Sequence, residues 1–106
     1  MPGLTATVQH VVTGGPDGDV KYYWVLEDGE LRDAQLGARP EPDITLTIPH
    51  ADVTGVLQGD IDVNVLYMQG RMKTAGDPGK LLQLLRSTTT PEYRAAQERT
   101  RSITDL

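Results

Sequence analysis

The sequence contains no cysteine and no phenylalanine, and it has only one tryptophan among its 106 residues. Without cysteine the chain can form neither a disulfide framework nor a thiolate metal site. Without phenylalanine the bulk of its core must come from aliphatic residues, four tyrosines and the single tryptophan. The two histidines, His10 and His50, stand far apart in the sequence, with no further ligand at metal-binding spacing. We therefore expect no metal site and no cofactor.

Basic residues and long apolar runs are also scarce. The 10 Lys and Arg residues are outnumbered by 15 Asp and Glu, which gives a net charge of −5. This balance argues against nucleic acid as a partner, because phosphates need basic side chains, and it limits any membrane contact to a transient one. No apolar stretch approaches the ~20 residues of a membrane span, and residues 1–5 lack the basic and apolar regions of a signal peptide. The expected location is cytoplasmic.

Length and apolar spacing predict one small domain over residues 1–106. Its fold class is expected to be α+β, with about five strands in a mainly antiparallel sheet and short helices packed on one face. The last expected helix, residues 91–101, has few apolar residues on the face that would pack against the sheet. The expected strands are residues 5–13, 20–26, 31–36, 44–48 and 71–75, and the expected helices are residues 53–59, 62–70, 78–86 and 91–101.

Two local patterns are the clearest evidence for this fold. Asp28-Gly29, between two strand-like segments, is typical of a two-residue hairpin turn. In residues 44–48, three aliphatic residues alternate with two threonines. One face of that strand should therefore meet the core.

The most informative run covers residues 67–85. Gly70 suits the left-handed residue that closes a helix, and residues 71–75 alternate as a half-buried strand does. Asp77-Pro78 is a strong helix start, because Asp can cap free N–H groups and Pro has no N–H to lose at the first position. A leucine-rich helix follows.

This run resembles the signature of the sterol carrier protein type-2 (SCP-2) family. Residues 68–73 (Met-Gln-Gly-Arg-Met-Lys) and Gly76-Asp77 fill the places of that signature, and the resemblance extends over residues 8–86. It implies an SCP-2-like fold in which an apolar guest, such as a lipid or a sterol, lies between helices and sheet. Many family members carry a helix before the first strand, whereas only residues 1–4 precede it here. The expected form is therefore a small bacterial stand-alone domain without that helix.

The predicted ligand-binding residues are mostly apolar side chains expected to face the inner side of the sheet. By the resemblance, Gln69 presents its amide to the ligand, although a helix-end glutamine in water explains it equally well. Most of the apolar side chains are better explained as filled core, which the sequence does not distinguish from a cavity wall. The predicted set is Trp24, Leu46, Val53, Val56, Leu57, Val65, Tyr67, Met68, Gln69, Met72, Leu81, Leu84 and Leu85.

No catalytic residues are predicted. The groups available near the expected sheet and helices, among them His10, Tyr22, Asp62 and Tyr67, form no base–nucleophile pair by their spacing. The first expectation is therefore a protein that binds or transfers a hydrophobic small molecule without turnover. A small tailoring enzyme, or an accessory of one, is the first alternative. The second is an interaction module, either a homodimer or a domain that docks on a larger enzyme, because a missing helix could leave an apolar patch exposed.

Overall fold

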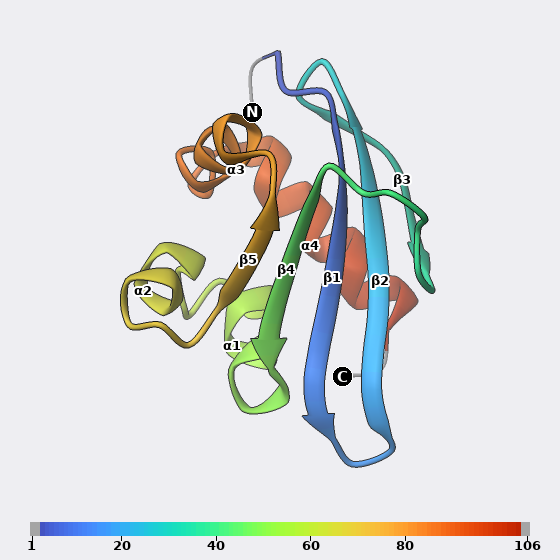
Figure 1. Cartoon of the computed structure of the whole chain (residues 1–106), viewed down its shortest axis with the longest axis vertical. Helices are drawn as coiled ribbons and strands as arrows, with labels where there is room; N and C mark the ends of the chain where they lie inside the picture. The colour runs from blue at the N-terminus through green and yellow to red at the C-terminus, as the bar shows by residue number, and fades with distance from the viewer. Residues whose placement is uncertain (1–2, 105–106) are drawn as a thin grey trace.

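The computed structural model describes residues 3–104. Within that range the chain forms five strands and four helices (Figure 1). In chain order they are β1 (Ala6–Gly15), β2 (Gly18–Glu27), β3 (Glu30–Leu36), β4 (Ile44–Pro49), α1 (His50–Gln58), α2 (Val63–Met68), β5 (Lys73–Gly76), α3 (Pro78–Leu85) and α4 (Pro91–Ile103).

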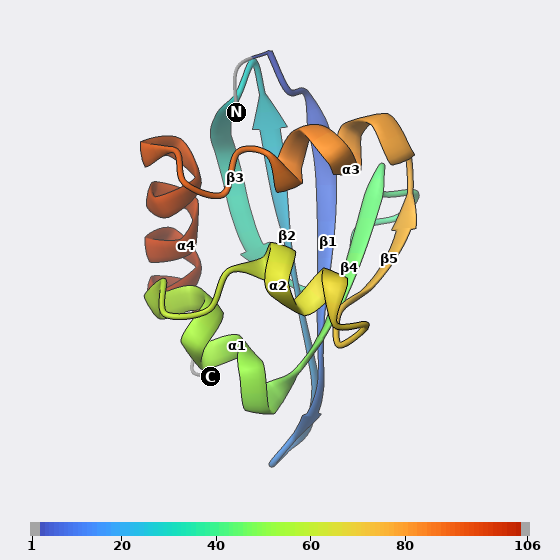
Figure 2. The ribbon, with the colours of Figure 1, turned by 90° about the vertical axis from the view of Figure 1, so that its left-hand side faces the viewer.

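The strands form one sheet in the order β3-β2-β1-β4-β5. Strands β1 and β4 pair in parallel, and the other three pairings are antiparallel. All four helices lie on the same face of this sheet, as Figure 2 shows from the side. The expected α+β class and the mainly antiparallel sheet with helices on one face are confirmed.

The local sequence patterns account for the sheet. Asp28 and Gly29 both adopt positive φ angles, 51° and 82°, which is the conformation of the tight hairpin predicted there. In β4 the side chains of Ile44, Leu46 and Ile48 are buried, while the two threonines between them are partly exposed. The apolar face of β4 therefore meets the core, as its alternation predicts.

Three helices begin at the capping residues that the sequence indicates. A carboxylate oxygen of Asp77 accepts hydrogen bonds from the N–H groups of Gly79 and Lys80, at 2.9 and 3.1 Å. Asp62 caps α2, and Thr90 caps α4. None of the helices within residues 3–104 is long and apolar enough to span a membrane.

Helix α4 brings its one buried side against the first strands and α1. The indole N–H of Trp24, on β2, donates to the hydroxyl of Thr100, on α4, at 2.8 Å. The ring of Tyr93, also on α4, meets the Trp24 ring edge-on, with 5.6 Å between ring centroids. These contacts fix α4 over the sheet and form one wall of the site described next.

Candidate functional site

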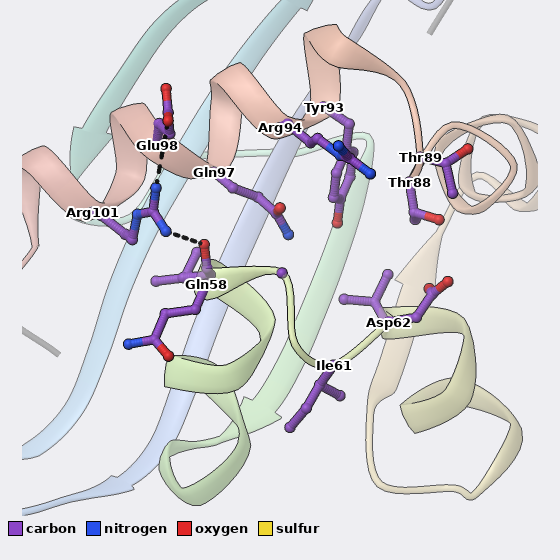
Figure 3. A pocket seen from close by; sticks show the side chains of 13 residues that line it. Gln58, Ile61, Asp62, Thr88, Thr89, Tyr93, Arg94, Gln97, Glu98 and Arg101 are labelled. Carbon is purple, nitrogen blue, oxygen red and sulfur yellow. Dashed lines mark hydrogen bonds and ion pairs between the residues drawn. The ribbon is translucent and has the colours of Figure 1, made fainter.

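An open cleft of about 420 Å³ lies between α4 on one side and the end of α1 and the start of α2 on the other (Figure 3). We call it the outer cleft. Its remaining walls come from the loop of residues 59–62 and from Thr88 and Thr89, which lie between α3 and α4. Arg94 and Arg101 reach its rim from α4, where Glu98 and Asp62 supply opposite charge. The rim is thus polar and of mixed charge.

The α1–α4 side of the cleft is held by two hydrogen bonds from α4. The Gln97 side-chain amide donates to the carbonyl oxygen of Val56 at 3.0 Å, and the Arg101 guanidinium donates to that of Leu57 at 3.0 Å. The same guanidinium lies 3.7 Å from the Glu98 carboxylate. Carbonyls in the last turn of a helix need such outside donors, so α4 completes the end of α1.

A second pair of elements is joined on the opposite side of the cleft. The side-chain amide of Asn64, on α2, donates to the carbonyl oxygen of Leu85 at 2.8 Å and to the hydroxyl of Thr88 at 3.2 Å. Leu85 is the last residue of α3. Helix α2 is therefore tied to the end of α3, as α1 is tied to α4.

Beneath the outer cleft, between helices and sheet, lies a small cavity of about 10 Å³, which we call the inner cavity. Four side chains line both spaces and separate them; we call them the partition. They are Leu57 from α1, Val63 from α2, and Tyr93 and Gln97 from α4. The rest of the inner cavity is lined by His10, Tyr22, Trp24, Leu46, Ile48 and Val56.

His10 is the unusual member of this lining. Its side chain is 4% exposed, and neither ring nitrogen has a hydrogen-bond partner within residues 3–104. Its ring stacks on Tyr22, with centroids 4.5 Å apart and planes 11° apart, and it packs at a tilt against Trp24 at 4.4 Å. Burial lowers the pKa of His10 from 6.5 to about 3, because a charged imidazole would be desolvated there. His10 is therefore neutral at physiological pH.

The two phenols beside it stay neutral for the same reason. Burial is the main cause that raises the pKa of both Tyr22 and Tyr93. The neighbouring Tyr93 raises the pKa of Tyr22 further, and the charge of Asp62 does the same for Tyr93. Of the described residues, those that line the inner cavity include no Lys, Arg, Asp or Glu. Among residues 3–104, no three His, Cys, Asp or Glu side chains come together to hold a metal ion. The geometry suits an apolar guest with a neutral polar group rather than a buried ion.

The structure brings some of the sequence-predicted site residues together and separates others. Trp24, Leu46, Val56 and Leu57 line the inner cavity. A second group lies in the core away from both spaces: Val53, Met72, Leu84 and Leu85 are buried and Leu81 is partly buried. A third group is exposed at α2 and its end: Val65, Tyr67, Met68 and Gln69. Ligand contact by any of these residues stays a prediction.

The apolar residues of α1, α2 and α3 are expected from the sequence to face the sheet. This expectation is wrong for Val65, Met68 and Leu82, which are exposed. Helix α2 has only six residues, and it buries Val63 and Leu66. Residues three apart share a face of a helix, so Val65 and Met68 lie together on the other side. The sequence of α2 carries two apolar stripes, Val63 with Leu66 and Val65 with Met68, and only the first of them packs against the core.

Sequence reasoning missed the contribution of α4 to the site. Tyr93, Ala96, Gln97 and Thr100 are buried although the helix is polar on average. Their spacing of three and four residues is the helical-face signal that could have revealed it. Two of the four are polar, however, and polar residues are not counted in an apolar stripe.

Comparisons with known proteins agree on the fold. Residues 4–94 match the family described as Alkyl sulfatase C-terminal. Palmitated SCP2L2 from Aedes aegypti is similar with a TM-score of 0.69 and 17% identity, covering 82% of this chain and 75% of that chain. Sterol carrier protein 2 from Yarrowia lipolytica, in its apo form, gives 0.61 and 21%, covering 76% and 69%. The predicted resemblance to the SCP-2 family is confirmed.

An enzyme is also among the similar structures. The sec-alkylsulfatase Pisa1 from Pseudomonas sp. is similar with a TM-score of 0.58 and 22% identity, over 80% of this chain but only 13% of the sulfatase. No curated protein sequence matches the chain. These low identities establish the fold and leave the function to be argued from the site.

Proposed function

This chain belongs to the alkyl sulfatase C-terminal family, and from that premise we propose that it binds a small molecule with an alkyl chain between its helices and its sheet. The alkyl chain lies in the outer cleft and reaches the inner cavity past the partition. The observation that carries the proposal is that the two spaces share four lining side chains. Moving those side chains joins an open cleft to an apolar interior.

The similar structures support this class of ligand. The Aedes aegypti protein is described as palmitated, and the Pseudomonas enzyme as a sec-alkylsulfatase. Palmitate and an alkyl sulfate both combine an alkyl chain with one polar end. Burying such a chain gains ~0.8 kcal/mol for each CH₂ group, which is enough to repay the displacement of a few side chains.

The site offers its own reporter of binding. Trp24 is the only tryptophan of the chain, and it lines the inner cavity. A ligand that passes the partition should therefore change its fluorescence. We expect 1-decanol to change the Trp24 emission in a saturable way, and native mass spectrometry to find one ligand for each chain.

A matched pair of variants tests where the ligand lies. Gln97→Glu puts a negative charge into the partition at nearly the same size and removes the donor to the Val56 carbonyl. It should weaken binding of 1-decanol about tenfold, because a bound alkyl chain would strip water from the buried carboxylate. Gln69→Glu makes the same change at the exposed end of α2 and should leave the affinity unchanged. Titration of Trp24 fluorescence measures both, and thermal unfolding of each variant without ligand serves as the folding control.

The reverse result would place the ligand's polar end at Gln69, as the resemblance to the SCP-2 family implies. Failure of the wild-type protein to bind any alkyl compound, with a dimer as the main species in native mass spectrometry, would instead support the interaction-module alternative.

The alkylsulfatase similarity favours a second candidate function. In that enzyme, a domain with this fold makes up 13% of the chain, so the fold also occurs as one part of a larger catalyst. The second candidate is therefore an accessory that presents its bound alkyl compound to a separate enzyme. Under both candidates, 1-decanol or decyl sulfate incubated with this chain alone should be recovered with its mass unchanged. A new product mass, absent without protein, would instead support the tailoring-enzyme alternative.

A further inference from the structure

We propose that His10 is the hydrogen-bonding anchor for a hydroxyl group at the end of the ligand's alkyl chain. The inference rests on the proposed function and adds an orientation to it. The hydroxyl goes in first and lies in the inner cavity, and the alkyl chain runs outward past the partition to the outer cleft. The ligand class is then a long-chain alcohol rather than an alkyl anion.

The unsatisfied hydrogen bonds of His10 are the first argument. A buried polar side chain without a partner costs free energy, and folded proteins contain few of them. Both nitrogens of His10 are in that state within the described residues, in a side chain that is 4% exposed. The ring lies face to face with Tyr22, so a partner must approach its edge, and His10 lines the inner cavity.

The size of the inner cavity is the second argument. Its volume of about 10 Å³ corresponds to one water-sized group. A hydroxyl fits that space once the partition has moved to admit its alkyl chain, whereas a carboxylate or a sulfate is too large. A single water molecule is the competing occupant, and the test below distinguishes the two.

The charge of the lining is the third argument. A neutral imidazole has a donor on one ring nitrogen and an acceptor on the other, and a hydroxyl, which has both functions, can pair with whichever of the two it meets. The other polar groups in the lining are the phenols of Tyr22 and Tyr93, the Trp24 indole and the Gln97 amide, all of them neutral. The Trp24 N–H is already bonded to Thr100 and the Gln97 amide to Val56. An anion in this place would be desolvated without a counter-charge.

The test is a cycle of two ligands and two proteins. 1-Decanol and 1-chlorodecane have the same chain, but only the alcohol can donate and accept strong hydrogen bonds. Wild-type protein should bind the alcohol about tenfold more tightly, which corresponds to ~1.4 kcal/mol. In His10→Leu the two ligands should bind equally, whereas His10→Gln, which keeps a donor and an acceptor, should retain part of the preference. A merely structural role for His10 would change both affinities together.

Brominated alcohols test the orientation in the wild-type protein. Bromine quenches indole fluorescence at contact range, and Trp24 borders the inner cavity. Bromine in the half of the chain that carries the hydroxyl should therefore quench Trp24 more strongly than bromine at the far end of the chain.

The outcomes separate this inference from the proposed function. If neither ligand binds the wild-type protein, the proposed function fails. If both ligands bind but the wild-type protein shows no preference for the alcohol, the proposed function stands and the role of His10 is overturned; a water held permanently by His10 would give this result. A preference that persists in His10→Leu would overturn the role of His10 as well. Decanoate binding more tightly than 1-decanol at pH 7, with that advantage lost in Arg94→Gln, would also overturn it by placing the polar end at the rim.

Discussion

Gly76→Ala should destabilise the protein by about 3 kcal/mol or more, the largest loss that we expect from a single methyl group. Gly76 has a φ of +109°, which L side chains rarely adopt. A Cβ at this position would lie 2.1 Å from the carbonyl oxygen of Asp43, which is backbone and cannot rotate away. Gly76 also pairs with Ile44, so the alanine would push β5 off β4. Urea unfolding measures the loss.

Gly70→Ala is the matched control. Gly70 also has a positive φ, +72°, but a Cβ there would meet nothing within 4 Å. It carries only the cost of the left-handed conformation, about 1 kcal/mol. Equal losses in the two variants would contradict the close approach of β5 to Asp43. An insoluble Gly76→Ala beside a folded Gly70→Ala would support it.

Acidification from pH 7 to pH 5 should cost the wild-type protein about 2 kcal/mol more than it costs His10→Leu. The pKa of His10 is about 3 in the folded protein and 6.5 in the unfolded chain, so between these values the unfolded state binds a proton that the folded state does not. Stability is therefore complete above pH 6.5 and falls by ~1.4 kcal/mol for each pH unit down to about pH 3. Urea unfolding at several pH values measures both proteins.

The comparison isolates His10 because Asp43, the carboxylic acid with a shifted pKa, titrates below this pH range. The hydrogen bond from the Thr7 N–H, with help from Lys80, lowers the pKa of Asp43 in the folded protein. Its contribution is therefore present above its ordinary pKa of 3.8 and lost below it, outside the window from pH 7 to pH 5. Parallel pH profiles for wild type and His10→Leu would mean that the imidazole is not buried as a neutral group.

The same variant should be more stable than the wild type at pH 7. Leucine has about the volume of histidine and leaves no polar atom unsatisfied, so the gain should be about 1 kcal/mol. A gain in stability together with a loss of preference for the alcohol would identify His10 as a residue that the protein keeps at a cost to its fold.

The sequence was most informative where a few neighbouring residues decide the structure. The Asp28-Gly29 turn, the alternation of β4 and the Asp77 cap are properties of short segments, and each was predicted correctly. The surroundings of His10 could not be predicted in this way. They arise from β2, β4, α1, α2 and α4 together, and nothing in the residues next to His10 indicates that its nitrogens find no partner within residues 3–104.

The ties between the helices determine how the site can open. Gln97 and Arg101 join α1 to α4, while Asn64 joins α2 to the end of α3, so the four helices form two tied pairs, which we call the halves. Both chain connections between the halves, residues 59–62 and 86–90, border the outer cleft. For a ligand bound as proposed, exchange would require a hinge motion about these two connections, and its residence time would depend on how fast the halves separate rather than on the rotation of any single side chain.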